Sequence, residues 1–293
     1  MSFKLPPNHQ QLYAEVYSRC LALIDLGYWT RIDKSILDDW LSNFTNKEEK
    51  FFAIQILFHF KFRNNKTIIS MFNQIIQVLL PQKLEELNIY KINSISDWEK
   101  TLKTSDKELF KLPFRFSTIN KKGAIGESGD ALFRLMAQKN ILNKKLGRFI
   151  DSITSECKVV ILIDDITGSG GQFIDFFNRY KENFNQFDYI IYAPLIAHIE
   201  AIDKLTKLDN RIHIITSEIL TKEESFYKIF DENNSNERYL EFTKKIIKDK
   251  RLKIKFPLGY SEQAILYGLE LSTPNNNHSF VYHDIEWYPL LRR

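Results

Sequence analysis

The chain has few cysteines and only a small net charge. Its 293 residues include two cysteines, Cys20 and Cys157, which lie far apart and match no metal-ligand spacing. We therefore expect two buried thiols in a reducing compartment, and neither a disulfide scaffold nor a cysteine-based metal site. The formal charge of +4 is mild for this length. It permits an anionic partner but does not by itself indicate nucleic acid.

Long apolar runs are also missing. The N-terminus, Met-Ser-Phe-Lys-Leu-Pro-Pro, lacks the apolar core of a signal peptide. The apolar runs at 75–80 and 159–163 fall far short of the ~20 residues that a membrane-spanning helix needs. The apolar fraction of 44% and the charged fraction of 27% are those of a globular protein. The sequence thus predicts a cytoplasmic protein without a membrane partner.

The first hundred or so residues have the apolar spacing of helices. One helix is expected over 35–44, and a second, largely apolar helix follows it. Thr45, with Glu48 three residues later, has the pattern of a capping box for the second helix. A third helix is expected over 67–80, ended by Pro81. Such a region fits a winged-helix-like unit or any small helical bundle.

From about residue 111 the pattern changes to apolar strands separated by helices. Strands are expected at 114–119, 159–163, 189–193 and 211–216, with helices from 128, over 171–180 and over 198–208. This alternation predicts an α/β fold, a parallel sheet flanked by helices. We predict a helical N-terminal region over 1–110 and a sheet-containing domain over 111–293. The charged segment 221–250 is expected to form a helical insertion or C-terminal hood.

Two carboxylates and a glycine-rich segment follow the second expected strand. Asp164 and Asp165 come directly after the apolar run, so they are expected at the carboxyl edge of the sheet, where ligands bind in such folds. The next residues are small and lead into a helix. Their backbone N–H groups can converge on a phosphate, which the helix dipole favours. Paired carboxylates beside a phosphate indicate a sugar phosphate, whose hydroxyls need acceptors or whose metal needs ligands.

Three other interpretations of this loop are open. A strand that ends in two carboxylates resembles a Walker B element, but the chain contains no Gly-x-x-x-x-Gly-Lys-Ser/Thr. A dinucleotide-binding fingerprint needs a third glycine, and Phe173 stands at that position. The third is a tight acidic β–α turn that binds no ligand.

The order of these residues resembles the signature of type I phosphoribosyltransferases. The resemblance implies that Asp164 and Asp165 hold the ribose hydroxyls of phosphoribosyl pyrophosphate as catalytic residues and contribute indirectly to binding Mg²⁺. The loop that would cradle the 5-phosphate consists of Thr167, Gly168, Ser169, Gly170, Gly171 and Gln172. Many members have an acid or a hydroxyl where this chain has Gly168 and Gln172. Gly168 cannot serve as a base for transfer to a free purine.

A narrower resemblance rests on Asp-Asp-x-x-Gly-Ser-Gly-x-Gln over 164–172, Thr-Pro-Asn-Asn over 273–276 and Trp-Tyr-Pro over 287–289. These motifs are similar to the phosphoribosyltransferase-like (PRTase-CE type) domains of bacterial conflict systems, which include retron-associated effectors. The resemblance implies an effector of anti-phage defence that acts at C1′ of phosphoribosyl pyrophosphate or a nucleotide, as a phosphoribosyl transferase or an N-glycosidase-like enzyme. A catalytically inactive nucleotide-sensing or protein-binding module is the alternative. A defence-system protein or nucleic acid is the expected partner of the N-terminal helical region.

A second anion site is expected where the helix from residue 128 begins. The backbone N–H groups of Ser128 and Gly129 could meet the pyrophosphate. An ordinary serine cap with an acidic first turn is the alternative. His198, His213 and His283 have no metal-ligand spacing and are interpreted as structural or surface residues.

Overall fold

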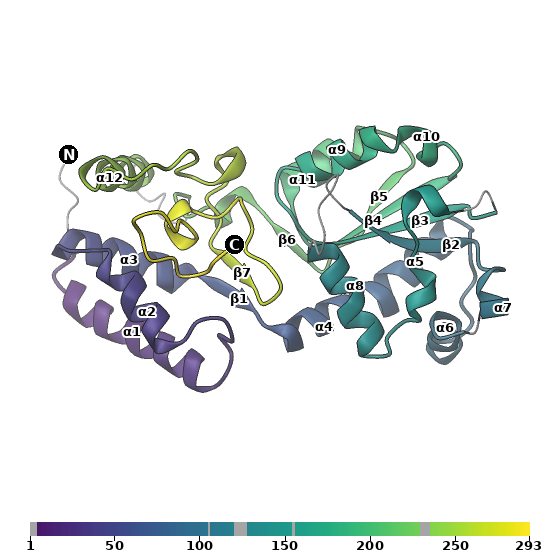
Figure 1. Ribbon diagram of the computed structural model, residues 1–293, viewed down its shortest axis with the longest axis horizontal. Coiled ribbons are helices and arrows are strands. Elements are labelled where there is room, and N and C mark those ends of the chain that lie inside the picture. Colours follow the sequence, from purple (N-terminus) through teal and green to yellow (C-terminus); the bar gives the residue numbers. More distant parts are fainter. Residues whose placement is uncertain (1–4, 105, 120–127, 154–155, 229–234) are drawn as a thin grey trace. The chain divides into compact units, whose positions relative to one another are not determined.

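The computed structural model describes residues 5–104, 106–119, 128–153, 156–228 and 235–293. The chain divides into two compact units (Figure 1). The central unit consists of residues 66–220, and the terminal unit combines residues 1–65 with residues 221–293. The predicted domains, 1–110 and 111–293, divide the chain at a different place, and that division stays a prediction.

The central unit contains a five-stranded parallel sheet. Its strands are β2 (Phe114–Thr118), β3 (Val159–Thr167), β4 (Tyr189–His198), β5 (Ile212–Ile214) and β6 (Glu218–Leu220). The order is β2-β3-β4-β5, and β6 pairs with the last residues of β4. All neighbours are parallel, so the predicted α/β fold is confirmed. The three-residue strand β6 was not predicted, because so short a segment has no apolar period of its own.

Helices cover both faces of this sheet. On one face lie α9 (Gly171–Arg179), α10 (Lys181–Phe184) and α11 (Ile199–Thr206), and α8 (Ser128–Gln138) lies on the other (Figure 1). Phe173 of α9 packs in one buried cluster with Val160 of β3 and Ile190 of β4. This packing fixes the loop between β3 and α9 at the carboxyl edge of the sheet.

The remaining helical elements of this part of the chain precede and follow β2. They are α4 (Asn65–Gln74), a π-helical turn (Ile75–Leu79), α5 (Leu80–Glu86), α6 (Ile95–Leu102), α7 (Asp106–Leu109) and two 3₁₀ turns (Lys144–Leu146 and Ile150–Ser152). The prediction that Pro81 ends a helix is wrong. The helix continues through Pro81, because the π-helical turn before it widens the hydrogen-bond pattern and the carbonyl of Ile76 accepts instead from the indole N–H of Trp98, at 2.7 Å.

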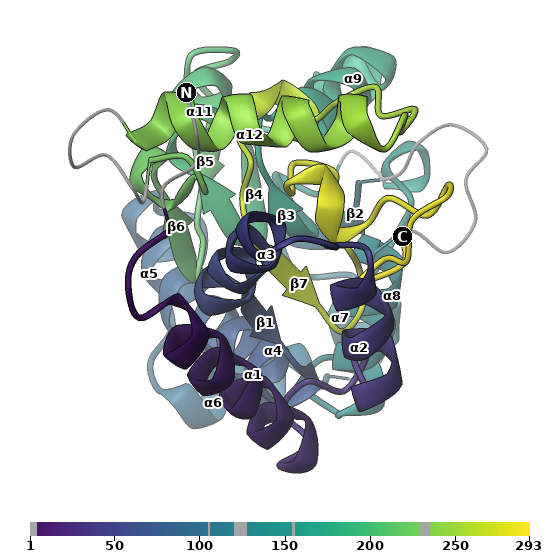
Figure 2. The same ribbon diagram turned by 90° about the vertical axis from the view of Figure 1, so that its left-hand side faces the viewer.

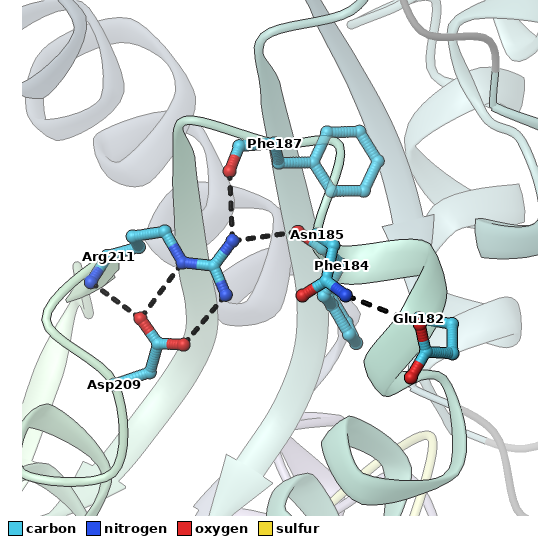
Figure 3. Close-up of polar contacts among 6 residues, drawn as sticks. All are labelled: Glu182, Phe184, Asn185, Phe187, Asp209 and Arg211. Carbon is cyan, nitrogen blue, oxygen red and sulfur yellow. Dashed lines mark hydrogen bonds and ion pairs between the residues drawn. The ribbon is translucent and has the colours of Figure 1, made fainter.

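Arg211 makes several hydrogen bonds at the amino end of the sheet (Figure 3). The guanidinium of Arg211, just before β5, donates to the carboxylate of Asp209, with 2.7 Å between Nη2 and Oδ2. It also donates to the backbone carbonyls of Phe184 and Phe187, at 2.9 and 3.1 Å. The hydrogen bonds of the ion pair lower the pKa of Asp209 and raise the pKa of Arg211. Arg211 thereby joins the end of α10 to the start of β5.

Arg211→Lys is expected to destabilise the protein by about 1–2 kcal/mol, because an ammonium group cannot serve the carboxylate and both carbonyls at once. The lowered pKa of Asp209 means that the stability from the pair is present above the usual carboxyl pKa of about 3.9 and is lost as the pH falls through the lower folded-state value. Asp209→Asn should therefore flatten the acid-induced loss of stability below about pH 4.

Thermal melts at neutral and acid pH measure both effects. Glu241→Gln is the control, since it removes the exposed pair between Glu241 and Lys244 and should change stability by less than about 0.5 kcal/mol. Equal shifts for Arg211→Lys and Glu241→Gln would contradict the structural role of Arg211.

The terminal unit is mainly helical. Its elements are α1 (His9–Asp25), α2 (Lys34–Ser42), α3 (Lys47–His59), α12 (Ser235–Asp249), the strands β1 (Lys61–Arg63) and β7 (Tyr267–Leu269), and 3₁₀ turns at Lys222–Glu224, Tyr260–Glu262 and Ser279–Val281. Strands β1 and β7 pair in parallel, although they are far apart in the sequence. None of the helices in the described ranges is long and apolar enough to cross a membrane. The helices predicted over 35–44 and within 221–250 correspond to α2 and α12.

The predicted capping box of the second helix is wrong by one residue. The side chain of Asn46, and not that of Thr45, accepts from the backbone N–H of Glu49, at 2.9 Å. The carboxylate of Glu49 accepts in turn from the backbone N–H of Thr45, at 2.8 Å. Asparagine caps helices as well as threonine does, so the sequence Thr45-Asn46 offers two starting points that local preference does not separate.

The Thr-Pro-Asn-Asn turn is part of the framework of the terminal unit. The side chain of Asn276 donates to the carbonyl of Tyr260 at 3.0 Å. The next residue, Asn277, is fully buried and bonds both the N–H and the carbonyl of Tyr267, at 2.7 and 2.6 Å. His278 is also buried, and burial lowers its pKa to about 3, which keeps the ring neutral. These residues hold the loop before β7 in place.

Candidate functional site

The paired carboxylates lie inside β3, whereas the sequence placed them just after the strand. The strand continues to Thr167 because β4 continues beside it, with Ile166 opposite Ile196. Asp164 and Asp165 are therefore only 2% and 4% exposed. Successive side chains of a strand point to opposite faces. Asp164 points to the face of α9, where it meets Tyr192 of β4, and Asp165 points to the face of α8.

Asp164 is a buried carboxyl with two polar partners. Its Oδ2 accepts from the hydroxyl of Tyr192 at 2.8 Å, and its Oδ1 accepts from the backbone N–H of Asp165 at 3.0 Å. Burial, and then the negative charge of Asp165, raise the pKa of Asp164 well above its usual value. The hydrogen bond from Tyr192 acts in the opposite direction but is the smaller effect. A buried carboxyl whose pKa is raised by burial and by a neighbouring charge is typical of functional sites.

Asp164→Asn is expected to raise the melting temperature by about 3 °C or more at neutral pH, because the amide keeps polar partners and removes a buried charge. The raised pKa means that the contribution of Asp164 to stability is present at low pH and is lost as the pH rises through the folded-state pKa. The gain from Asp164→Asn should therefore grow as the pH rises above the usual carboxyl pKa of about 3.9.

Thermal melts of both proteins at a series of pH values, from acid to mildly alkaline, test this expectation. Asp175→Asn, on the exposed side of α9, is the matched control and should have little effect at any pH. A gain that does not vary with pH, or a loss of stability for Asp164→Asn, would contradict the electrostatic account of Asp164.

The loop after β3 leads into a helix that has no capping side chain. Gly170 occupies the N-cap position of α9 in the left-handed region, with φ +74°, which glycine adopts without strain. The backbone N–H of Gly171 donates to the hydroxyl of Ser169 over a long 3.4 Å. Gly168 is buried and Gln172 is exposed. An uncapped helix start with small residues before it can accept an anion.

The helix that holds the second predicted anion site starts beside β3, the strand that carries the two carboxylates. The predicted helix start at Ser128 is confirmed by α8. A Cβ atom on Gly129 would lie 3.1 Å from the carbonyl oxygen of Ile163 and 3.4 Å from Cβ of Thr118. The start of α8 therefore packs closely against the end of β2 and the middle of β3, next to Asp164 in the sequence. The side chain of Ser128 and residues 120–127 lie outside the described part of the chain.

The structure thus brings together the predicted residues from two separate segments. Asp164, Asp165 and the loop over 167–172 come from β3 and α9, and Gly129 comes from α8. The start of α8 lies beside Ile163, directly before the two carboxylates, and the start of α9 follows the carboxyl end of β3. Two helix starts along one strand suit a ligand with two anionic groups. The sequence analysis missed Tyr192. The sequence shows a tyrosine within the apolar run 189–193, which could have suggested a buried polar contact. Only the strand register, with Tyr192 opposite Leu162, brings it next to Asp164.

A directly bound metal ion does not fit these residues well. The described residues contain no group of three or more His, Cys, Asp or Glu side chains that could hold one. Both oxygens of Asp164 already accept hydrogen bonds. Magnesium is often held by one or two carboxylates together with substrate phosphates. Asp165 is the carboxylate of this site that such an arrangement would use.

One comparison with known proteins finds a family that matches most of the chain. The model of the PRTase-CE family matches residues 37–293, which include the whole of β3, the loop over 167–172 and the turn over 273–276. A search of curated proteins finds no match to the chain.

Proposed function

Because the chain belongs to the PRTase-CE family and carries a phosphoribosyltransferase-like domain, we propose that it binds phosphoribosyl pyrophosphate, or a nucleotide with the same ribose 5-phosphate, at the carboxyl edge of β3. The observation that carries this proposal is the start of α9 without a capping side chain, just beyond the glycine-rich loop that follows β3 and its Asp164-Asp165 pair. The 5-phosphate would accept from the backbone N–H groups of the loop over 167–172.

Asp165 is the carboxylate that we expect to meet the ribose. Ribose hydroxyls are donors and need acceptors, which an ionised carboxylate supplies. Both carboxylates accept a backbone N–H, Asp165 from Ile166 at 2.8 Å and Asp164 from Asp165 at 3.0 Å, and Asp164 accepts in addition from the hydroxyl of Tyr192. Asp164 would fix the backbone of Asp165 and approach the second hydroxyl when a ligand binds.

The chemistry would take place at C1′. Its bond to pyrophosphate or to a base breaks, and the electron pair leaves with that group, so positive charge develops on the ribose. Water or another acceptor then forms the new bond to C1′ and gives up its proton to the leaving group or to solvent. The backbone N–H groups at the start of α8 would stabilise the negative charge on the leaving group. Binding of the distant 5-phosphate by the loop over 167–172 would supply free energy for distortion at C1′. Magnesium, carried in with the pyrophosphate, would add further charge stabilisation.

Identification of small molecules tests binding and turnover separately. Mass spectrometry of the purified protein should find a bound ribose 5-phosphate compound. Incubation with phosphoribosyl pyrophosphate or nucleoside monophosphates, with and without Mg²⁺, should release ribose 5-phosphate, pyrophosphate or a free base. Failure to bind any of these compounds would contradict the proposal.

A catalytically inactive sensing module is the second candidate. Gly168 and Gln172 favour it, because neither supplies the acid or hydroxyl that active relatives tend to have at these positions. Binding of a nucleotide without any product after long incubation would support this candidate. Detection of ribose 5-phosphate or a free base would exclude it.

A role as an effector of bacterial defence against phage is a further part of the proposal. This role is supported only by the chain's membership of the PRTase-CE family. Membership of a family is an association and not a physical argument for a role. Expression of the chain alone should slow bacterial growth, and Asp164→Asn with Asp165→Asn should relieve the effect. Unchanged toxicity of the double variant would separate toxicity from the ribose site. A protein or nucleic-acid partner of the N-terminal helices stays a prediction.

A further inference from the structure

One strongly charged segment of the terminal unit has no part in the ribose site. Residues 244–255 contain seven basic side chains and one acidic side chain, Asp249. The basic residues are Lys244, Lys245, Lys248, Lys250, Arg251, Lys253 and Lys255. The formal charge of this short segment alone exceeds the +4 of the whole chain. Such a concentration of charge indicates an anionic partner.

The fold displays this charge on the surface. α12 lies beside α3 (Figure 2). It buries its apolar side chains, and Phe242 contacts Phe52 of α3 with 5.5 Å between the ring centroids. The exposed side of its second half therefore consists largely of lysines. Lys250 pairs with Glu49, and Lys244 pairs with Glu241. Among the described residues, the other basic side chains of the segment have no acidic partner.

Two aromatic rings stand next to the charged segment. Phe256 and Tyr260 are 43% and 42% exposed, and their ring centroids lie 5.9 Å apart. Lys255 lies over the Phe256 ring, with 5.1 Å from Nζ to the centroid. The exposed parts of these two aromatic side chains, beside lysines without an acidic partner, do not contribute to a hydrophobic core. Their ring faces are accessible to a binding partner.

The backbone that carries these rings is held in one conformation. The N–H of Tyr260 donates to the carbonyl of Asn275 at 2.8 Å, and the carbonyl of Tyr260 accepts from Asn276. Ser261 and Glu262 are both in the left-handed region, with φ of 57° and 55°. Such strain persists only where the surroundings enforce it, and it clusters at binding sites. The rings are therefore presented by a rigid loop.

We infer that the surface formed by residues 244–260 binds single-stranded nucleic acid. The lysines would neutralise successive phosphates, and Phe256 and Tyr260 would stack on unpaired bases. A lipid surface fits less well, because α12 buries its apolar stripe and has no such face left to insert. An acidic peptide would satisfy the lysines but would leave the two rings without a function. The inference does not depend on the ribose site.

Fluorescence anisotropy with a labelled oligothymidine of about 20 nucleotides tests the electrostatic part. The affinity should fall as salt rises, with a slope of about −0.7 for each phosphate neutralised. The triple variant Lys245→Glu, Lys248→Glu and Lys253→Glu should bind at least about 100-fold more weakly. The control triple Lys103→Glu, Lys107→Glu and Lys139→Glu makes the same charge change at exposed positions of the central unit. Equal losses for both triples would overturn the inference.

A second variant tests the aromatic part. Phe256→Ala with Tyr260→Ala should weaken binding about 10-fold or more and leave the salt dependence unchanged, because stacking does not involve counterions. Unpaired DNA should also bind more tightly than the duplex. An unchanged affinity of the aromatic variant, equal affinity for the duplex, or binding to phosphatidylglycerol vesicles but not to DNA would overturn the inference. Circular dichroism melts establish that each variant is folded.

Discussion

Ser169→Asp should weaken the binding of phosphoribosyl pyrophosphate and of ribose 5-phosphate by about three decades. Ser169 stands in the loop that we assign to the 5-phosphate, next to Gly170 and the start of α9. A carboxylate there would lie about 4 Å from a phosphate dianion, and two like charges at that distance repel by roughly 4 kcal/mol at an effective dielectric constant of 20. That energy corresponds to about a thousandfold in affinity.

The same substitution should leave the fold intact. A carboxylate at the uncapped start of α9 is neutral or mildly stabilising when no anion is bound. The variant should therefore keep its melting temperature in buffer and lose the upward shift that the ligand gives the parent. Ser169→Asn, which has the same shape without the charge, is the control and should retain most of the shift. If the parent and Ser169→Asp shift equally, the loop is not the phosphate site.

Gly259→Ala should destabilise the protein by about 3 kcal/mol or more. A Cβ atom at this position would lie 2.3 Å from the carbonyl oxygen of Asn277 and 2.5 Å from that of Asn276. Both are backbone atoms, and the carbonyl of Asn276 accepts from the N–H of Ile265, so they cannot move without breaking the turn. The backbone of Gly259 is also left-handed, with φ +74°. Strain and collision act together here.

Gly27→Ala separates these two causes. Gly27 also has a positive φ, +64°, but an added Cβ there would meet no atom within 4 Å. Its substitution should cost only the conformational penalty of about 1–2 kcal/mol. Urea denaturation of both variants measures the difference. Similar losses of unfolding free energy would mean that the collision at Gly259 is relieved in solution, and that the Thr-Pro-Asn-Asn turn is less rigid than we infer.

The elements that the sequence predicted well are those whose signal is local. The strand core over 159–163 is continuously apolar, and the segment after it is rich in glycine, so both the strand and the loop could be recognised. Pro81 was misinterpreted because proline usually ends a helix, whereas here the π-helical turn before it lets the helix continue. Local preference does not predict such a turn.

The parts that were missed depend on contacts between distant residues. The pairing of β1 with β7 joins three-residue segments about two hundred residues apart, and neither has a period of its own. The contact of Tyr192 with Asp164 follows from the register between β3 and β4, which no local pattern specifies. The burial of Asp164 and Asp165 was missed for the same reason. The strand continues past the apolar run because its neighbour does.

Isothermal titration calorimetry of the parent protein with ribose 5-phosphate and with phosphoribosyl pyrophosphate in the presence of Mg²⁺ tests the central claim most directly. We predict heat of binding from both ligands, no heat from ribose that lacks the phosphate, and loss of the heat in Ser169→Asp but not in Ser169→Asn. The absence of heat from both phosphorylated ligands and from nucleoside monophosphates would contradict the assignment of a ribose 5-phosphate site to β3 and the loop before α9.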